Sequence, residues 1–458
     1  MVQQKREIFI IAMLGSFIGP FTGSSVNVAL PALGRELGMN TLMLSWVQLA
    51  YLLTVAMLIL PIGRMADLLG RKRVLMAGTL LFAATSLACS LSSGAVTLIL
   101  SRIAQGISGA AVGVAIVAMV SSAFPAGERG GVLGMTAAAT YTGLSLGPFL
   151  GGLLTTHWGW RSVFWVILPV CAAMAALLTT LRQEWRETDG KRFDRLGALI
   201  YSVGLLTLMG GLTLVHRPPG IILMLLGIVA LTFFARYEAG IGSPMLDMRL
   251  LRENPVVLYA SIAALINYCA TFSVGYLLSL QMQAGMGFTA GAAGTVLVAQ
   301  PLVQAFVSPL AGRLSDRKDP GVVASVGMGV TTLGLVLFAV LPPDSIGLTV
   351  AVLALLGLGL SLFVSPNTNA IMNAVEKKHY GAASGLLGTA RSMGQAFSMG
   401  ITALIMTLVM GDVPIAQGSQ TLFVTSYRLS FGVMAALCLL GMFASLARRR
   451  STLPDSNE

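Results

Sequence analysis

Charged side chains are scarce in this sequence. Only 10% of the 458 residues are Asp, Glu, Lys or Arg, whereas 55% are hydrophobic. Because soluble domains carry roughly one charged residue in four, these side chains are too few to cover a water-exposed surface. The 4 cysteines are too few for a disulfide scaffold, and their spacing fits no metal site. The composition excludes a soluble or disulfide-rich protein and predicts that lipid surrounds most of the chain.

Acidic and histidine side chains are absent from the middle of the apolar runs. All 18 acidic residues and the 3 histidines lie in predicted loops, in the tails or at the ends of predicted spans. A membrane-embedded enzyme needs clustered His, Asp, Glu or Cys side chains for acid–base or metal chemistry. The sequence also contains no glycine-rich string of the kind that binds nucleotide phosphates. We therefore expect no enzyme, no catalytic residue, no metal and no cofactor.

The apolar runs are long and continuous, which favours membrane-spanning helices over the short alternating strands of an outer-membrane barrel. Charge clusters and Pro, Gly or Asn residues divide the chain into fourteen such runs. We therefore predict an all-α membrane protein with 14 transmembrane helices. The predicted spans cover residues 7–32, 43–63, 73–92, 96–120, 131–154, 162–181, 196–215, 219–237, 255–281, 289–311, 321–342, 346–371, 382–410 and 426–447.

Lysine and arginine residues are distributed unevenly among the predicted loops. With the amino terminus placed in the cytoplasm, twenty-three of the 29 basic residues fall on the cytoplasmic side and four on the outer side. This bias follows the positive-inside rule and predicts that both termini are cytoplasmic. The net charge of +11 then faces the anionic inner leaflet, and it gives no reason to expect nucleic acid as a partner.

Two short strings occur twice in the chain in closely similar form. Gly63–Asp67 recurs as Gly312–Asp316 at an offset of 249, and Gly131–Gly134 recurs as Gly385–Gly388 at an offset of 254. Each string keeps its position relative to the predicted spans. We therefore predict two pseudo-symmetric six-helix bundles, which is the plan of secondary transporters with a substrate site between the halves.

The repeat divides the chain into three predicted parts. Residues 1–181 form an N-terminal six-helix bundle, and residues 255–458 form a C-terminal one. Residues 182–254 hold two inserted helices, the seventh and eighth, with their flanking cytoplasmic loops.

One copy of the repeat has the spacing Gly-x-x-x-Asp-x-x-Gly-Arg between the second and third predicted spans. This string resembles the loop signature of the major facilitator superfamily, and the resemblance implies the fold of that family. Glycine permits the turn and a close helix approach, and Asp67 is expected to face a helix amino terminus or an arginine and to latch the cytoplasmic side shut. A plain basic loop that only sets the topology is the alternative. The predicted latch residues are Gly63, Asp67, Gly70 and Arg71, with Arg313 and Asp316 in the second copy.

Two arginines lie within predicted spans. Arg102 stands in Leu98-x-x-x-Arg102-x-x-Gln105-Gly106, which resembles the fourth-helix motif of the same superfamily. Because an arginine in lipid is costly, Arg102 should face a polar cavity or a partner; the alternative is a side chain that snorkels to the outer interface. Arg391 lies about ten residues into its span, near the midplane at about 1.5 Å per residue. Together the two arginines would give the site a positive potential.

The fifth predicted span contains Gly143, Gly147, Pro148, Gly151 and Gly152. The Gly-x-x-x-Gly spacing makes a flat face for close helix contact, and Pro148 removes a backbone hydrogen bond. The string resembles the motif that is characteristic of exporters in this superfamily and is usually interpreted as a sign of antiport. Simple tight packing is the alternative for the same glycines.

Four further stretches resemble the 14-helix drug:H+ antiporter subfamily, namely Asn27–Pro31, Trp158–Arg161, Asp194–Gly197 and Pro244–Leu250. The sequence departs from that subfamily at Thr22, which stands where a carboxylate is usual. An intramembrane carboxylate is the usual proton carrier and the usual counter-charge for a cationic drug. The hypothesis is therefore that the substrates are neutral, zwitterionic or anionic amphiphiles.

Neutral polar side chains supply the remaining candidates for a substrate cavity. Each of them is as reasonable a contact between helices as a substrate contact. The candidates are Thr22, Asn27, Gln48, Tyr51, Gln105, Tyr141, Tyr268, Gln300, Gln304, Asn367 and Gln395.

The sequence predicts a monomeric secondary efflux transporter in the inner membrane of a prokaryote. It would export small amphiphilic compounds or drugs by alternating access and proton antiport, with the substrate, protons and membrane lipids as its partners. The alternative is an exporter or facilitator of an endogenous metabolite or lipid-like solute without classical proton coupling. A measurement of counterflow driven by a pH gradient alone separates the two.

Overall fold

The computed structural model describes residues 2–186, 193–215, 218–242, 244–246, 248–376, 380–411 and 420–450, and its regular structure in these ranges is helical. The helices are α1 (Val2–Leu37), α2 (Thr41–Leu69), α3 (Arg71–Ser90), α4 (Ala95–Ala123), α5 (Ala126–Trp158), α6 (Ser162–Trp165), α7 (Leu168–Thr180), α8 (Arg195–Thr213), α9 (Pro218–Gly240), α10 (Met248–Glu253), α11 (Pro255–Thr271), α12 (Val274–Leu280), the π-helix η1 (Gln281–Gly285), α13 (Ala290–Leu297), α14 (Ala299–Arg317), α15 (Pro320–Val340), α16 (Ile346–Asn373), α17 (Tyr380–Met410) and α18 (Gln420–Arg450).

Thirteen stretches of the described chain are long and apolar enough to cross a membrane. This finding confirms an all-helical membrane protein, and it is one span fewer than the fourteen predicted. The predicted span that is not among the thirteen is α5, whose glycines and threonines lower its hydropathy.

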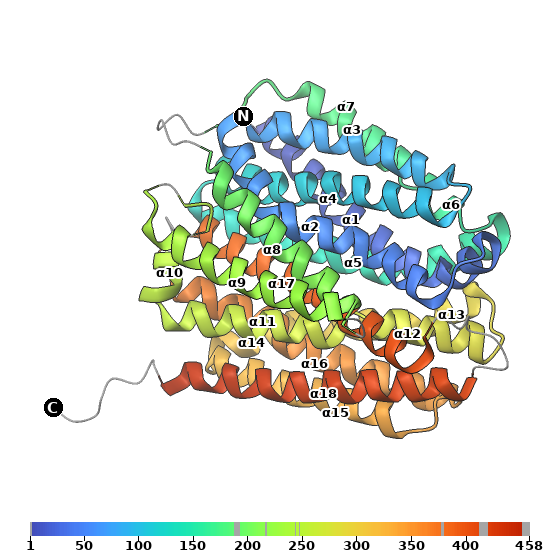
Figure 1. The fold of residues 1–458 in the computed structure, drawn as a ribbon. Helices are drawn as coiled ribbons and strands as arrows, with labels where there is room; N and C mark the ends of the chain where they lie inside the picture. Colours follow the sequence, from blue (N-terminus) through green and yellow to red (C-terminus); the bar gives the residue numbers. More distant parts are fainter. Residues whose placement is uncertain are drawn as a thin grey trace.

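The long helices lie side by side, and the start of α1 and the end of α18 lie at the same end of the bundle (Figure 1). We call this the terminal end and the opposite one the far end. The turn between α2 and α3 lies at the terminal end, and the turn between α1 and α2 at the far end.

Three of the predicted spans are interrupted, one beside a hydrogen bond to another helix and two shortly before a proline. The backbone N–H of Ser273, between α11 and α12, donates to Ser398 Oγ at 3.1 Å instead of to a carbonyl in its own helix. Pro301 and Pro169 have no N–H to donate, and the helix is interrupted a few residues before each of them, at Val298 and between α6 and α7. Proline and serine therefore account for breaks that the apolar pattern did not predict.

Prolines inside α1 and α2 create acceptors for neighbouring helices. A proline lacks the N–H that would bond the carbonyl four residues earlier, so that carbonyl is free to accept another donor. In three places a hydroxyl from another helix donates to it. The three sets of proline, carbonyl and donor are Pro20, Ser16 and Thr140 (3.3 Å); Pro31, Asn27 and Ser279 (2.9 Å); and Pro61, Met57 and Ser202 (3.1 Å).

Contacts between helices define two groups, which are themselves joined by extensive packing of α2 on α17 and of α5 on α13. In the first group, α1 packs along α5, and α2 and α3 pack along α4, with α6 and α7 against α3. In the second group, α11 packs along α17 and α18, and α15 and α14 pack along α16. We call helices α1–α7 the first group and helices α11–α18 the second group.

The helices α8 and α9 pack mainly on each other. α8 also contacts α2 of the first group and α17 of the second group. Only 17% of the most apolar window of α9 is buried, so α9 lies at the periphery, where its apolar side chains are suited to lipid. α8 is therefore the inserted helix that touches both groups.

Candidate functional site

Arg102 of α4 is the centre of a buried polar network. Its side chain is fully buried, and its Nε donates to the Val47 carbonyl at 3.0 Å. One terminal nitrogen donates to Gln48 Oε1 at 2.7 Å, and the other donates to Gln105 Oε1. The guanidinium carbon lies 4.4 Å from the centre of the Tyr51 ring, a cation–π distance. Neutral acceptors and an aromatic ring thus surround the charge.

The Arg102 network continues to the boundary between the two groups. Gln48 Nε2 donates to Asn27 Oδ1 at 2.8 Å in α1. The Asn27 carbonyl accepts from Ser279 Oγ of the second group, and Gln283 Nε2 donates to the Val28 carbonyl at 2.8 Å. The π-helix η1 carries Gln283, and π-helical turns are often found at functional sites. Asn27 therefore joins the buried arginine network to the interface.

Further hydrogen bonds join described residues of the two groups, also at the far end. Ser45 Oγ and Tyr276 Oη lie 2.9 Å apart, between α2 and α12. The Gly291 N–H at the start of α13 donates to Thr156 Oγ1 of α5 at 3.0 Å. The far end is thus held together by polar contacts between the groups.

The glycine motif of α5 lies in the seam with α1. A Cβ on Gly143 would stand 2.8 Å from the Phe17 carbonyl oxygen, and one on Gly151 would stand 2.7 Å from Ser25 Cα. Gly147, one turn from each, faces α1 as well. Only glycine allows backbones to approach this closely.

The adjoining face of α5 packs on the second group. A Cβ on Gly152 would overlap the Ala290 carbonyl of α13, and a Cβ on Gly294 would overlap the Pro148 carbonyl of α5. The motif therefore makes two close contacts, one inside the first group and one between the groups.

Arg391 differs from Arg102 in being exposed, although it lies well inside α17. Tyr141 of α5 and Tyr268 of α11 lie close enough to Arg391 to interact with it electrostatically. Gln395 is on the same face of α17, one turn away, and is partly exposed. Because Tyr141 belongs to the first group and Arg391 to the second, this arginine lies between the groups and not on a lipid-facing surface.

The other predicted cavity residues lie in packed positions or apart from Arg391. Thr22 is fully buried, and its hydroxyl bonds to the carbonyl four residues earlier in α1. Asn367 is 1% exposed and donates to the Ala260 carbonyl at 3.1 Å, which ties α16 to α11. Gln304 is buried in α14, and Gln300, one turn earlier, is partly exposed.

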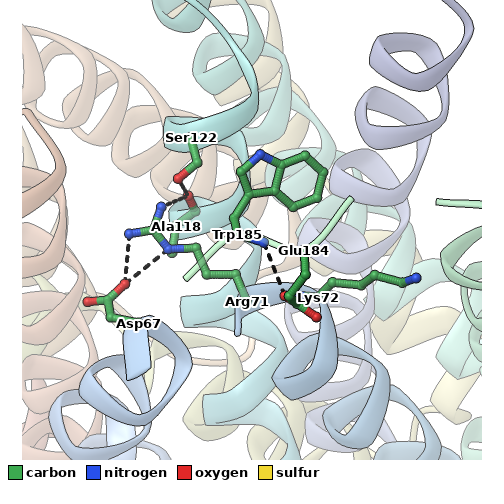
Figure 2. A network of polar contacts seen from close by, with 7 residues as sticks. All are labelled: Asp67, Arg71, Lys72, Ala118, Ser122, Glu184 and Trp185. Carbon is green, nitrogen blue, oxygen red and sulfur yellow. Dashed lines mark hydrogen bonds and ion pairs between the residues drawn. The ribbon is translucent and has the colours of Figure 1, made fainter. Parts of the chain in front are cut away.

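The loop signature at the terminal end forms a network within the first group, as Figure 2 shows. Asp67 Oδ1 accepts from Arg71 Nε at 3.0 Å and from a terminal nitrogen of Arg71 at 2.8 Å. Another Arg71 nitrogen donates to the Ala118 carbonyl at 3.0 Å, which also accepts from Ser122 Oγ. Arg71 therefore ties the turn between α2 and α3 to the end of α4.

Glu184, which follows α7, closes the same network from the other side. Its Oε1 accepts from the Lys72 N–H at 2.9 Å, and the Trp185 carbonyl accepts from the Arg71 N–H at 2.8 Å. Gly70 has a φ of 113°, and a Cβ there would stand 2.6 Å from Glu184 Cδ. Glycine is thus required at this turn for both its backbone angle and its size. Sequence reasoning missed Glu184, because a single glutamate in a loop has no motif.

The remaining glycine of the signature has a packing role. A Cβ on Gly63 would stand 3.1 Å from Val114 Cγ1 of α4, so this position favours a small residue where α2 approaches α4.

The second copy of the signature lacks the arginine pairing. Asp316 at the end of α14 is exposed, and within the described ranges its hydrogen bond is a long one of 3.5 Å from Asn369 Nδ2. The position that corresponds to Arg71 is Pro320, and Arg313 is exposed without an ion pair among the described residues. Of the predicted latch residues, only Asp67 and Arg71 are therefore brought together.

The Trp158–Arg161 stretch anchors the far end of the first group. Trp160 Nε1 donates to Glu36 Oε2 at 2.8 Å, and Arg161 forms an ion pair with the same carboxylate. The Arg161 guanidinium also lies 4.3 Å from the centre of the Trp160 ring. Glu36 at the end of α1 is a second partner that the sequence did not reveal.

Comparison with known proteins agrees with this architecture. The sequence matches the Major Facilitator Superfamily over residues 12–257 and 260–458. The riboflavin transporter RibZ of Clostridioides difficile (strain 630) is 28% identical over 98% of this chain and 99% of its own length. The multidrug resistance protein Stp of Mycobacterium tuberculosis (strain ATCC 25618 / H37Rv) is 32% identical over 86% of this chain and 74% of its own length.

A solved structure has the same fold. It is a bacterial homolog of the human lysosomal transporter Spinster, in an inward-facing and unoccupied conformation, with a TM-score of 0.70 at 14% identity over 99% of both chains. Because the family match spans nearly the whole sequence, this chain belongs to the Major Facilitator Superfamily, whose members are multi-pass membrane transporters and not enzymes.

Proposed function

We propose that this protein exports small amphiphilic compounds by alternating access, with protons as the counter-ion. The supporting observations are the polar contacts at the far end and the exposed Arg391 between the two groups. Relatives named as multidrug or antibiotic exporters, such as Stp and the cephamycin export protein CmcT of Amycolatopsis lactamdurans, support export.

The proposal treats the two groups as the moving halves. Residues 1–181 and 255–458 would form two pseudo-symmetric bundles, and residues 182–254 would carry the two inserted helices. We assign α5 as the fourteenth span, because it connects the terminal end to the far end and packs along α1. The hydropathy of α5 is low, but the close helix contacts along its glycine face stabilise it within the membrane.

The proposed location is the inner membrane of a prokaryote, with the terminal end in the cytoplasm. The bacterial relatives support a prokaryotic membrane. The excess of lysine and arginine in the loops on the side of the two termini supports the orientation. The protein would work as a monomer surrounded by lipid.

The substrate class follows from the charge between the groups. Arg391 lies beside Tyr141 and Tyr268, and no carboxylate occurs near the middle of the described spans. An uncompensated guanidinium attracts anions and repels cations, and tyrosine rings stack on aromatic ligands. We therefore infer neutral, zwitterionic or anionic amphiphiles as substrates. Riboflavin, named for one relative, carries no positive charge.

Arg391→Ala is expected to weaken the binding of an anionic aromatic ligand at least tenfold, because the positive charge at the site is lost. Binding is measured with purified protein by fluorescence, with riboflavin, an anionic fluorescent dye and a quaternary ammonium dye as probes. Arg428→Ala, an exposed arginine at the far end, is the matched control and should bind like the wild type. Tight binding of the quaternary ammonium dye that Arg391→Ala leaves unchanged would contradict the proposed substrate class.

A second function is favoured by the lack of a carboxylate at mid-span in the described helices. The protein would then be an exporter or facilitator of an endogenous metabolite or lipid-like solute without proton coupling. Proteoliposomes with a pH gradient and no substrate gradient distinguish the two, since only a proton antiporter drives substrate accumulation under that condition.

A further inference from the structure

The inserted helices α8 and α9 bring two carboxyl groups together at the terminal end. Asp194 is the N-cap of α8, and its Oδ1 accepts from the Gly197 N–H at 3.0 Å. Glu238 lies near the end of α9. A Cβ on Gly197 would overlap Asp194 Oδ2 and would stand 3.0 Å from Glu238 Oε1. Both oxygens therefore adjoin the same point beside Gly197, where a larger residue would place its Cβ, and they are no more than about 5 Å apart.

Both of these oxygens are buried and have no hydrogen-bond partner. Glu238 is 1% exposed, so its carboxyl group is taken out of water almost completely. Its other oxygen, Oε2, accepts from the Leu246 N–H at 3.3 Å, and Asp194 Oδ1 also accepts from Tyr237 Oη at 3.3 Å. Each carboxyl group is thus held by one oxygen, while the second oxygen points to the space beside Gly197.

The charged groups nearby do not neutralise the pair. The neighbouring elements contribute Tyr237 from α9, Arg64 near the end of α2, and the exposed Arg195 and Arg236. Neither acid forms an ion pair with an arginine or a lysine in the part of the chain that the structure describes. Asp247 and Lys377–His379 lie outside the described residues.

We propose that Asp194 and Glu238 form a proton-binding site in which the two carboxyl groups share one proton. Two ionised carboxylates whose oxygens lie within about 5 Å repel each other, and burial of an unpaired charge adds a further cost. One proton removes one charge and lets the protonated group donate to the other. This arrangement satisfies both unpartnered oxygens with a single hydrogen bond.

The place of the site in the fold connects it to both groups of helices. α8 begins at this pair, and farther along it Tyr201 Oη donates to the Ala56 carbonyl of α2 at 2.8 Å. Near its other end, α8 faces α17, where a Cβ on Gly400 would stand 3.3 Å from Met209 Sδ. A change of charge at the N-cap therefore acts on a helix that touches both groups. A role of this proton in transport rests on the proposed function, whereas the binding of the proton does not.

The test is infrared spectroscopy of the purified full-length protein in a detergent without ester groups. A protonated carboxylic acid has a carbonyl stretch that an ionised one lacks. At neutral pH, the wild type should show the signal of a buried protonated carboxyl group, and Glu238→Gln should lose it. The introduced amide can still accept from the Leu246 N–H, so this variant is expected to fold. Glu253→Gln, an exposed acid in α10, is the control and should keep the signal.

A second variant shows whether the two groups act as a pair. Asp194→Asn removes the neighbouring negative charge, so the remaining carboxyl group should lose its proton at a lower pH than in the wild type. This titration decides the question even where Glu238→Gln fails to fold. The proposal is overturned by a wild type without the signal, by a signal that survives Glu238→Gln, or by an Asp194→Asn titration equal to that of the wild type. Loss of the signal when sodium replaces choline at constant ionic strength would assign the site to a metal cation instead.

Discussion

Arg102→Ala is expected to lower the free energy of unfolding by about 2–4 kcal/mol, because each acceptor left without its donor costs about 1–3 kcal/mol and repacking recovers part of that loss. The variant leaves three acceptors without their donor, namely the Val47 carbonyl, Gln48 Oε1 and Gln105 Oε1. In the wild type these acceptors are closed off from bulk water, since Arg102, Gln48 and Gln105 are each fully buried.

Lysine at this position should not restore the wild-type stability. The three acceptors of Arg102 come from α2 and α4, and a planar guanidinium reaches all three at once, whereas an ammonium group is a compact charge at one point. Thermal unfolding in detergent, followed by size-exclusion chromatography, measures the loss. Arg35→Ala, an exposed arginine with one long hydrogen bond, should stay within about 0.5 kcal/mol of the wild type. An Arg102→Ala protein that melts at the wild-type temperature would show that the network does not stabilise the fold.

Asp67→Asn is expected to reduce transport at least tenfold while the protein is produced and folds normally. Both hydrogen bonds from Arg71 to this carboxylate are charge-assisted, and asparagine keeps the shape but loses the charge. Arg71 then holds α4 through the Ala118 carbonyl less firmly. Because the ion pair is partly exposed, its contribution to stability is small, about 0–1 kcal/mol, so the effect should appear in transport and not in folding.

Asp316→Asn is the matched comparison for Asp67→Asn. The two aspartates occupy the same place in the repeated string, but Asp316 is exposed, and its contact among the described side chains is the 3.5 Å one with Asn369. Uptake of substrate into vesicles should therefore fall much less in this variant. Full activity of Asp67→Asn, or an equal loss in both variants, would remove the Asp67–Arg71 pair from the mechanism.

The sequence allowed the helices to be predicted well, because hydropathy and charge act locally. Most predicted spans begin and end within a few residues of the observed helices, and the Asp67–Arg71 turn lies where the motif indicated. The interruptions at Ser273 and Val298 were not predicted. The first depends on Ser398, which lies 125 residues farther along the chain, and no local pattern contains that information.

The same limit applies to the candidate site. Arg102, Gln48, Gln105, Tyr51 and Asn27 were separate candidates in the sequence, and only the fold shows that five polar side chains form one buried network. Pro31 is visible in the sequence as the residue that frees a carbonyl, but the donor, Ser279, comes from the second group. Partners that are distant in the chain can be identified only from tertiary structure.

The account depends most on the claim that the far end must open and close during each transport cycle. Thr156 and Gly291 are in hydrogen-bond contact there, so cysteines at the two positions can form a disulfide between the groups. The four native cysteines are buried and do not interfere. Ser325→Cys with Ser445→Cys is the matched pair inside the second group, where the hydroxyls lie 2.8 Å apart.

The decisive measurement is substrate transport by Thr156→Cys/Gly291→Cys in proteoliposomes before and after oxidation. We expect oxidation to abolish transport and reduction to restore it, while the oxidised Ser325→Cys/Ser445→Cys protein remains active. Undiminished transport by the fully cross-linked Thr156–Gly291 pair would contradict the account, because substrate would then cross without separation of the two groups at the far end.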